Sequence, residues 1–319
     1  MKEIQIWEFI RSHLIKNNKV ILTAVLDHKK GSPGKQGFKM AVSSDRETAG
    51  SIGGGIMEYK ITEECKEYLK KDLIVNRLET VYHNRKKDVK NSGLICSGSQ
   101  TNFLFSIQKK DIKNVNKILN ALRNRKPGKM IFTSKGIFFR YVSKNTDDHF
   151  FEFKNDNDWK FEQTTVRNNI VYVVGGGHVG IALCKVLSLM DFYIIIFDSK
   201  KDLKNVNSYI YANKIITDSY SNLSKSVKDD SYIVIVTSGF DSDKDALLQV
   251  IRRKVKYIGL MGTNAKIKKI FSELRTGGIS DKFLNKIHAP VGIDINSNTP
   301  EEIAVSIAAE IIREKNKDL

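Results

Sequence analysis

A glycine-rich turn between an apolar run and a helical pattern constrains this chain more than any other stretch. Val171-Tyr-Val-Val leads into Gly175-Gly-Gly177-His-Val-Gly180, and apolar residues at helical spacing follow. In a Gly-x-Gly-x-x-Gly turn the first glycine permits the tight turn, the second lets a phosphate approach the backbone, and the third lets helix and strand pack closely. N–H groups at the helix start would face that anion. The stretch therefore predicts a strand, a phosphate-binding turn and a helix.

The residues beyond this turn predict a parallel sheet. A second strand-like run ends in Asp198, about 20 residues after the turn, where an acid that binds ribose hydroxyls is expected. The other reading of Asp198 is a strand-end aspartate that caps a turn. Strand-like runs at 232–236 and 257–260 alternate with helical patterns. This alternation is typical of a doubly wound parallel sheet of the Rossmann type.

Two domains are expected in a chain of 319 residues. The first half mixes helical patterns with strand-like runs, and a polar stretch between Trp159 and Asn169 precedes the Rossmann strand. We predict an α/β protein with an N-terminal α+β domain over residues 1–165 and a Rossmann-type domain over residues 166–319. The ligand is expected between them, at the carboxyl edge of the parallel sheet.

Composition excludes several classes of protein. No apolar stretch approaches the ~18 residues of a membrane span, and the N-terminus lacks the apolar region of a signal peptide. Cys65, Cys96 and Cys184 form no CxxC pair, which favours a reducing cytoplasm over disulfides or structural zinc. We take Cys65 and Cys184 as core residues. The net charge of +17 indicates a solvated, lysine-rich surface or attraction for anionic ligands, and no nucleic-acid-binding signature accompanies it.

A second glycine-rich segment lies in the first half. Gly50-Ser-Ile-Gly53-Gly54-Gly55 precedes a predicted helix that contains Glu58. Consecutive glycines before a helix can form a backbone nest that holds a phosphate. A turn that needs positive φ angles is the simpler reading. Glu58 suits the positive end of the helix dipole.

Several motifs together resemble one family, the xanthine dehydrogenase accessory (XdhC/CoxI) proteins. The resemblance covers nearly the whole chain and keeps the order of the motifs. It rests on Gly31-Ser-Pro33 to Met40, Gly50 to Glu58, Cys96-Ser97-Gly98, the Gly175–Gly180 turn, Tyr257 to Thr263, His288 to Asp294, and Thr299 to Glu310.

The resemblance implies a chaperone rather than a catalyst. Members of the family are thought to bind the molybdenum cofactor (molybdopterin), to support its sulfuration by a cysteine desulfurase, and to pass it to a xanthine-dehydrogenase-type enzyme. They are usually cytoplasmic homodimers. We therefore expect the same activity, partners and location for this chain, with no nucleic acid and no membrane span.

The resemblance also assigns roles to residues. The Cys96 thiolate, a soft ligand, would contact the metal or its transferable sulfur. Gly53, Gly54 and Gly55 would hold the phosphate, and Glu58 the amino groups of the pterin. The turn with Gly175, Gly177 and Gly180 would take a nucleotide part, next to Asp198. His178 would bind a phosphate or donate a proton, unless it merely faces solvent at a helix start.

The chain departs from the family at the chemical positions. Cys96-Ser97-Gly98 stands in place of Cys-Gly-Gly, and Ser238 and Phe240 stand where the family carries histidines, although Asp243 matches. These departures concern the chemistry more than the scaffold.

The alternative function is an NAD(P)-dependent oxidoreductase. The glycine turn and Asp198 suit a dinucleotide, and an acid at this position favours NAD over NADP. What is missing is an obvious acid–base set in the second domain, such as a Tyr-x-x-x-Lys or a paired His and Asp.

Overall fold

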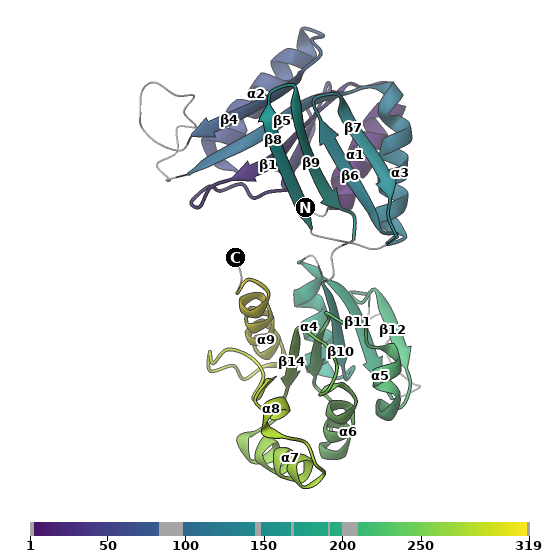
Figure 1. The fold of residues 1–319 in the computed structure, drawn as a ribbon, viewed down its shortest axis with the longest axis vertical. Coiled ribbons are helices and arrows are strands. Elements are labelled where there is room, and N and C mark those ends of the chain that lie inside the picture. Colours follow the sequence, from purple (N-terminus) through teal and green to yellow (C-terminus); the bar gives the residue numbers. More distant parts are fainter. Residues whose placement is uncertain are drawn as a thin grey trace. The chain divides into compact units, whose positions relative to one another are not determined.

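The computed structural model describes residues 3–82, 98–143, 148–166, 169–190, 192–199 and 210–317. The chain divides into two compact units, which we call the first unit (Met1–Arg167) and the second unit (Asn168–Leu319) (Figure 1). Cys96 lies outside the described residues.

The first unit contains two antiparallel sheets and three longer helices. One sheet has the strand order β3-β2-β1-β5-β4 and the other has the order β7-β6-β9-β8. The helices are α1 (Glu3–Ile15), α2 (Gly55–Lys70) and α3 (Ile112–Arg123), with a 3-10 turn η1 (Lys109–Asp111) before α3. The strands are β1 (Val20–His28), β2 (Lys39–Ser43), β3 (Thr48–Ser51), β4 (Asn76–Tyr82), β5 (Ser99–Ile107), β6 (Gly128–Thr133), β7 (Gly136–Tyr141), β8 (His149–Asn155) and β9 (Asp158–Thr164).

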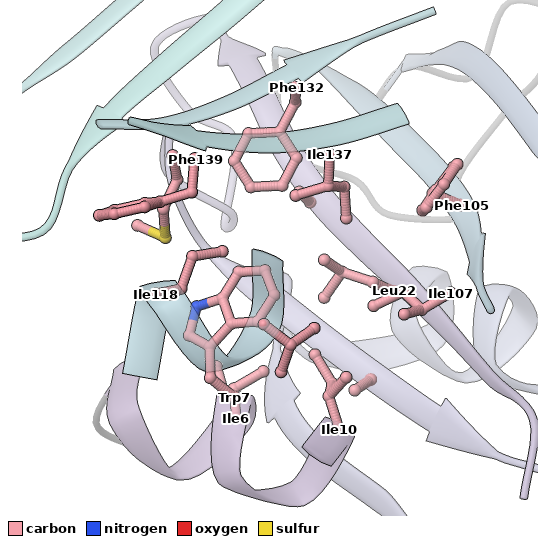
Figure 2. Packing of buried hydrophobic residues seen from close by; sticks show 14 of the residues in the cluster. Ile6, Trp7, Ile10, Leu22, Phe105, Ile107, Ile118, Phe132, Ile137 and Phe139 are labelled. Atoms are coloured by element: carbon pink, nitrogen blue, oxygen red, sulfur yellow. The ribbon is translucent and has the colours of Figure 1, made fainter. Parts of the chain in front are cut away.

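The main core of this unit lies between the two sheets and helices α1 and α3. Strand β6 alternates buried and half-buried residues, so Met130 and Phe132 point inward. Figure 2 shows the indole of Trp7 rising from α1 toward Phe132, with Ile10 of the same helix on the side of Leu22 and Ile107. Because α1 contributes fully buried side chains, its amphipathic face is what holds it to the sheets.

Helix α2 covers the opposite face of the five-stranded sheet. Met57, Ile61 and Cys65 of α2 pack with Ile21 and Val25 of β1 in a separate apolar cluster. Strand β1 is therefore covered on both faces, and its first seven residues are all buried. A continuous apolar run rather than an alternating one is the sequence pattern that such a strand requires.

A buried lysine ties three elements of the first unit together. The side chain of Lys39, on β2, is fully buried, and its Nζ lies 2.9 Å from Oε1 of Glu3 at the start of α1. The same ammonium donates to the carbonyl of Gly37 at 3.0 Å and to Gln163 of β9. A buried charge is tolerated when it is paired and hydrogen-bonded in this way.

The second unit is a doubly wound parallel sheet, as the sequence predicts. Its strand order is β12-β11-β10-β13-β14-β15, and the recorded strand pairs are parallel. Helices α4 and α9 contribute to the apolar cluster on one face, and α6 and α7 contribute to the cluster on the other. The elements are β10 (Ile170–Val174), α4 (His178–Ser188), β11 (Tyr193–Asp198), β12 (Lys214–Thr217), η3 (Tyr220–Asn222), α5 (Leu223–Ser226), β13 (Tyr232–Ile235), α6 (Phe240–Val250), β14 (Tyr257–Leu260), α7 (Asn264–Thr276), α8 (Asp281–Leu284), β15 (Ile287–His288) and α9 (Pro300–Lys315).

The order of these strands places the switch point of the sheet between β10 and β13. The chain winds outward from β10 in both directions, so the loops after β10 and β13 diverge at the carboxyl edge. Ligands of open α/β sheets bind in the crevice at such a point. Among the described residues, no helix combines the length and the apolar character that crossing a membrane needs.

We predict that Trp7→Ala lowers the free energy of unfolding of the first unit by about 3–5 kcal/mol, because the side chain is fully buried. Ile15→Ala, on the same helix but 58% exposed, should change it by less than about 0.5 kcal/mol. Urea denaturation followed by tryptophan fluorescence measures both, since Trp159 remains as a reporter in the first unit. Equal effects of the two substitutions would contradict the packing of α1 against the sheets.

Candidate functional site

The three motif glycines of the second unit have different surroundings. Gly175 has a φ of 116°, and a Cβ there would lie 2.6 Å from the carbonyl oxygen of Val236. A Cβ on Gly180 would lie 2.0 Å from the carbonyl oxygen of Gly175. A Cβ on Gly177 would meet nothing within 4 Å. The first and third glycines are thus required by packing, whereas Gly177 leaves open space at the start of α4, where helix N–H groups favour an anion.

His178 is the first residue of α4, directly after that open position. Its side chain is exposed. The position suits the predicted contact with an anionic ligand, which stays a prediction.

The predicted ribose-binding acid already has protein partners. Asp198 is 5% exposed, and its Oδ2 accepts the N–H of Gly176 at 2.6 Å. Its Oδ1 accepts the hydroxyl of Tyr220 at 3.2 Å. Burial, followed by the charge of Asp198, raises the pKa of Tyr220, so this hydroxyl stays a donor. The carboxylate ties the end of β11 to the glycine turn, and a ribose would have to exchange one of these bonds.

The glycine segment of the first unit encloses a carboxylate of its own chain. Gly53, Gly54 and Gly55 have φ angles of 127°, 75° and 68°. Oε2 of Glu58 accepts the N–H groups of Ile52 at 2.8 Å and Gly54 at 2.9 Å, and the hydroxyl of Ser51 at 2.6 Å. A phosphate bound by these donors would have to displace Glu58. Glu58 thus binds the donors of the turn that precedes its own helix, and its predicted contact with a pterin stays a prediction.

A buried polar cluster connects this turn to neighbouring backbone. Ser32 donates to Oε1 of Gln100 at 3.1 Å, and Nε2 of Gln100 donates to the carbonyl of Ile52 at 3.0 Å and to Oδ1 of Asn102 at 2.7 Å. Nδ2 of Asn102 is buried without a hydrogen-bond partner among the described residues. Sequence reasoning missed this cluster, because polar residues in a strand give no sign of which loops they will meet.

The two glycine-bearing loops of the first unit touch each other. A Cβ on Gly34 would lie 2.2 Å from the carbonyl oxygen of Ile52, and one on Gly53 would lie 2.5 Å from the nitrogen of Gly34. A Cβ on Gly98 would lie 2.9 Å from the nitrogen of Ser32. Gly98, which directly precedes β5 and stands two residues after Cys96 in the sequence, therefore packs closely on the loop that contains Ser32.

A buried ion pair lies near the carboxyl ends of β13 and β14. Asp243 is fully buried, accepts the hydroxyl of Thr237, and pairs with Nζ of Lys266. Burial raises the pKa of Asp243, which the bonds from Lys266 and Thr237 oppose. Thr237 and Asp243 therefore form a structural network, and Ser238 and Phe240, the departures from the resembled pattern, stand between them in the sequence.

His288 belongs to a structural network under α9. Its Nδ1 lies 3.2 Å from Oε1 of Glu310, and its ring lies 4.5 Å from the ring of Tyr257. Oε2 of Glu310 accepts the hydroxyl of Tyr257 at 2.7 Å and the N–H of Gly292 at 2.8 Å. Burial raises the pKa of Tyr257, and Glu310 raises it further. Glu310 thus joins β14, β15 and the following loop to α9.

The two described cysteines are unreactive core residues. Cys65 and Cys184 are fully buried, as predicted. Burial raises the pKa of each thiol to about 12, so both stay protonated at neutral pH. The predicted metal ligand Cys96 lies outside the described residues.

One group of described side chains has the composition of a metal site. Ligand atoms of His13, Asp45 and Glu47 lie within 4.8 Å of one another. However, Nδ1 of His13 is 3.4 Å from Asp45 and Nε2 is 3.4 Å from Glu47. Because each carboxylate faces a different ring nitrogen, the arrangement suits a bridging imidazole better than one shared metal ion.

We predict that Gly180→Ala lowers the free energy of unfolding by about 1–3 kcal/mol, since its Cβ would meet backbone at 2.0 Å. Gly177→Ala should change it by less than about 1 kcal/mol, because its φ of −73° suits alanine and the space is open. Thermal unfolding followed by circular dichroism compares the two variants. Similar losses would mean that the turn is packed differently.

We predict that Glu58→Ala destabilises the first unit by about 2 kcal/mol, because three donors lose a charged acceptor. Glu58→Gln should lose less, since its amide oxygen still accepts. Glu63→Ala, on the same helix, removes only a pair with Lys66 and should cost less than about 0.5 kcal/mol. Urea denaturation compares the three variants, and a neutral Glu58→Ala would contradict the role of this carboxylate.

Comparisons with known proteins agree with the architecture of both units. The sequence matches the XdhC Rossmann domain over residues 171–311 and the XdhC and CoxI family over residues 14–75. A crystal structure described as a xanthine dehydrogenase from Bacillus halodurans superposes with a TM-score of 0.77 at 18% identity, over 100% of this chain and 97% of that one. At this identity the likeness shows the fold.

Two curated relatives also match. The uncharacterized protein YqeB of Escherichia coli K12 is 22% identical over 292 residues, which cover 90% of this chain and 42% of that protein. A probable xanthine dehydrogenase subunit of Bacillus subtilis 168 is 30% identical over 84 residues, which cover 26% of this chain and 23% of that protein. The chain thus spans less than half the length of these relatives. From the two domain matches, in order along one sequence, the chain belongs to the XdhC and CoxI family.

Proposed function

We propose that this chain is an accessory factor of a xanthine-dehydrogenase-type enzyme, which binds the molybdenum cofactor and supports its sulfuration and insertion. The observation that carries the proposal is the presence of both family domains in order on one chain. The name of the Bacillus subtilis relative points to the same class of enzyme as the partner. In this role the cofactor is cargo, and the chain's task is to hold it and release it.

The second unit supplies the better phosphate site for such cargo. Gly177 leaves open space at the start of α4, so a phosphate or nucleotide part of the cofactor can approach the helix N–H groups. His178, exposed beside it, would donate to the same anion. The Gly53–Gly55 turn suits this task only after Glu58 is displaced, because Glu58 holds its donors. We therefore assign the phosphate first to Gly177.

The first unit supplies the sulfur chemistry in this proposal. Cys96 would contact the metal or its transferable sulfur, because the described thiols of Cys65 and Cys184 are buried and protonated. The closely packed loops around Gly34 and Gly53 would place the segment after Cys96 firmly. A cysteine desulfurase would deliver the sulfur, and the chain would act as a cytoplasmic homodimer.

The proposal predicts that the full chain binds molybdopterin and that Cys96→Ala weakens binding at least about tenfold, or about 1.4 kcal/mol. Gly177→Ala should also weaken it, because the methyl group enters the open space that the anion would use. Cys184→Ala is the matched control, since that thiol is buried in the second unit. Titration calorimetry measures all four proteins.

Different results bear on different parts of this role. Equal affinity of the wild type and Cys96→Ala would remove Cys96 from the site while leaving the binding role. Absence of molybdopterin binding by the wild type, or turnover of xanthine with NAD, would reject the accessory role. The second result would favour the oxidoreductase reading of the same glycine turn.

A further inference from the structure

The first unit contains a cavity that the proposed function does not use. It has a volume of about 280 Å³ and lies where α1 and α2 end, beside the start of β1 and the end of β5. Aliphatic side chains form most of its wall: Leu14, Val20, Leu69, Leu73, Ile74 and Ile107. A concave, mostly apolar site of this size is typical of binding sites for small molecules.

The solvent exposure of the wall residues increases from the base of the cavity to its mouth. Val20 is 0% and Ile107 is 2% exposed, whereas Leu73 is 49% and Ile74 is 73% exposed. Covering large water-exposed aliphatic side chains beside a cavity with an apolar group lowers the free energy. An apolar ligand would therefore enter past Ile74 and end against Val20.

The rim of the cavity is formed by two fixed turns. Asn17 and Asp72 have φ angles of 62° and 56°, the left-handed conformation that ends a helix. The N–H of Asn18 donates to the carbonyl of His13 at 2.9 Å, and that of Leu73 donates to Tyr68 at 2.9 Å. These bonds close the last turns of α1 and α2, so the mouth is formed before any ligand arrives.

Among the described residues, one cation at the rim has no acidic partner. Lys19 pairs with Asp72. Nζ of Lys109 donates to the amide oxygen of Asn17 at 3.3 Å, and the recorded ion pairs of the described residues include none to Lys109. The rim therefore carries one net positive charge beside an apolar interior.

We propose that this cavity binds a small organic anion with an aliphatic body, such as a medium-chain monocarboxylate. The alkyl chain lies along the aliphatic wall, and the carboxylate pairs with Lys109. Because the site lies wholly in the first unit, it is separate from the glycine turn of the second unit, and it does not depend on the accessory role.

The test is titration calorimetry of the full chain with hexanoate, butyrate and the neutral analogue hexanamide. Each methylene buried in the cavity should raise the affinity about fourfold, so hexanoate should bind at least about tenfold more tightly than butyrate. Lys109→Gln should weaken hexanoate about fivefold and bring it near hexanamide. Lys110→Gln is the matched control, because this neighbouring lysine is exposed and outside the cavity wall.

A second pair of variants tests the mouth. Ile74→Glu places a like charge where the ligand enters and should weaken hexanoate, whereas Ile15→Glu, 58% exposed and outside the wall, should leave it unchanged. Both positions are exposed, so both variants should fold. The proposal is overturned if hexanoate does not bind saturably, or if hexanamide binds the wild type as tightly as hexanoate does. It is also overturned if Lys110→Gln weakens hexanoate as much as Lys109→Gln, or Ile15→Glu as much as Ile74→Glu.

Discussion

At the switch point of the second unit, the backbone of the glycine turn lies directly against the start of α4 and the residue after β13. The rest of the unit depends on this close approach. Gly175 lies against Val236 at the end of β13, and Gly180 lies against Gly175 itself. Only glycine leaves room for both approaches, so the turn, the first residues of α4 and the neighbouring strand keep one arrangement. Asp198 reinforces it through the N–H of Gly176. The open position at Gly177 lies between residues that these contacts hold in place.

In the first unit, internal charge pairing joins elements that are distant in sequence. Glu58 occupies its own glycine turn, and Lys39 is buried against Glu3 and Gln163. A buried charge such as Lys39 is costly when unpaired, so it fixes the elements that supply its partners. A glycine turn that already contains a carboxylate also resembles an anion site in sequence, because the same backbone donors serve both. That explains why the pattern of Gly53–Gly55 alone indicates a phosphate site, whereas the position of Glu58 shows the donors already in use.

Sequence reasoning was strongest where the determining contacts are local. The strand, turn and helix at Val171–Gly180 depend on residues close together in the chain, and the structure has them. The partners of Asp198, Glu58 and Gln100 were not predicted, because each is chosen by which loops the fold brings together. The cavity beside Lys109 was equally invisible, since it lies between the ends of four elements distant in sequence. The role of Cys96 stays a prediction.

Burial of two sulfur atoms has a practical consequence. Cys65 and Cys184 keep their protons up to strongly alkaline conditions. A maleimide fluorophore or nitroxide applied to the native protein near neutrality therefore does not react with either thiol, because both are buried and protonated. A thiol-directed spectroscopic label can thus be placed at a chosen surface position without first replacing Cys65 or Cys184.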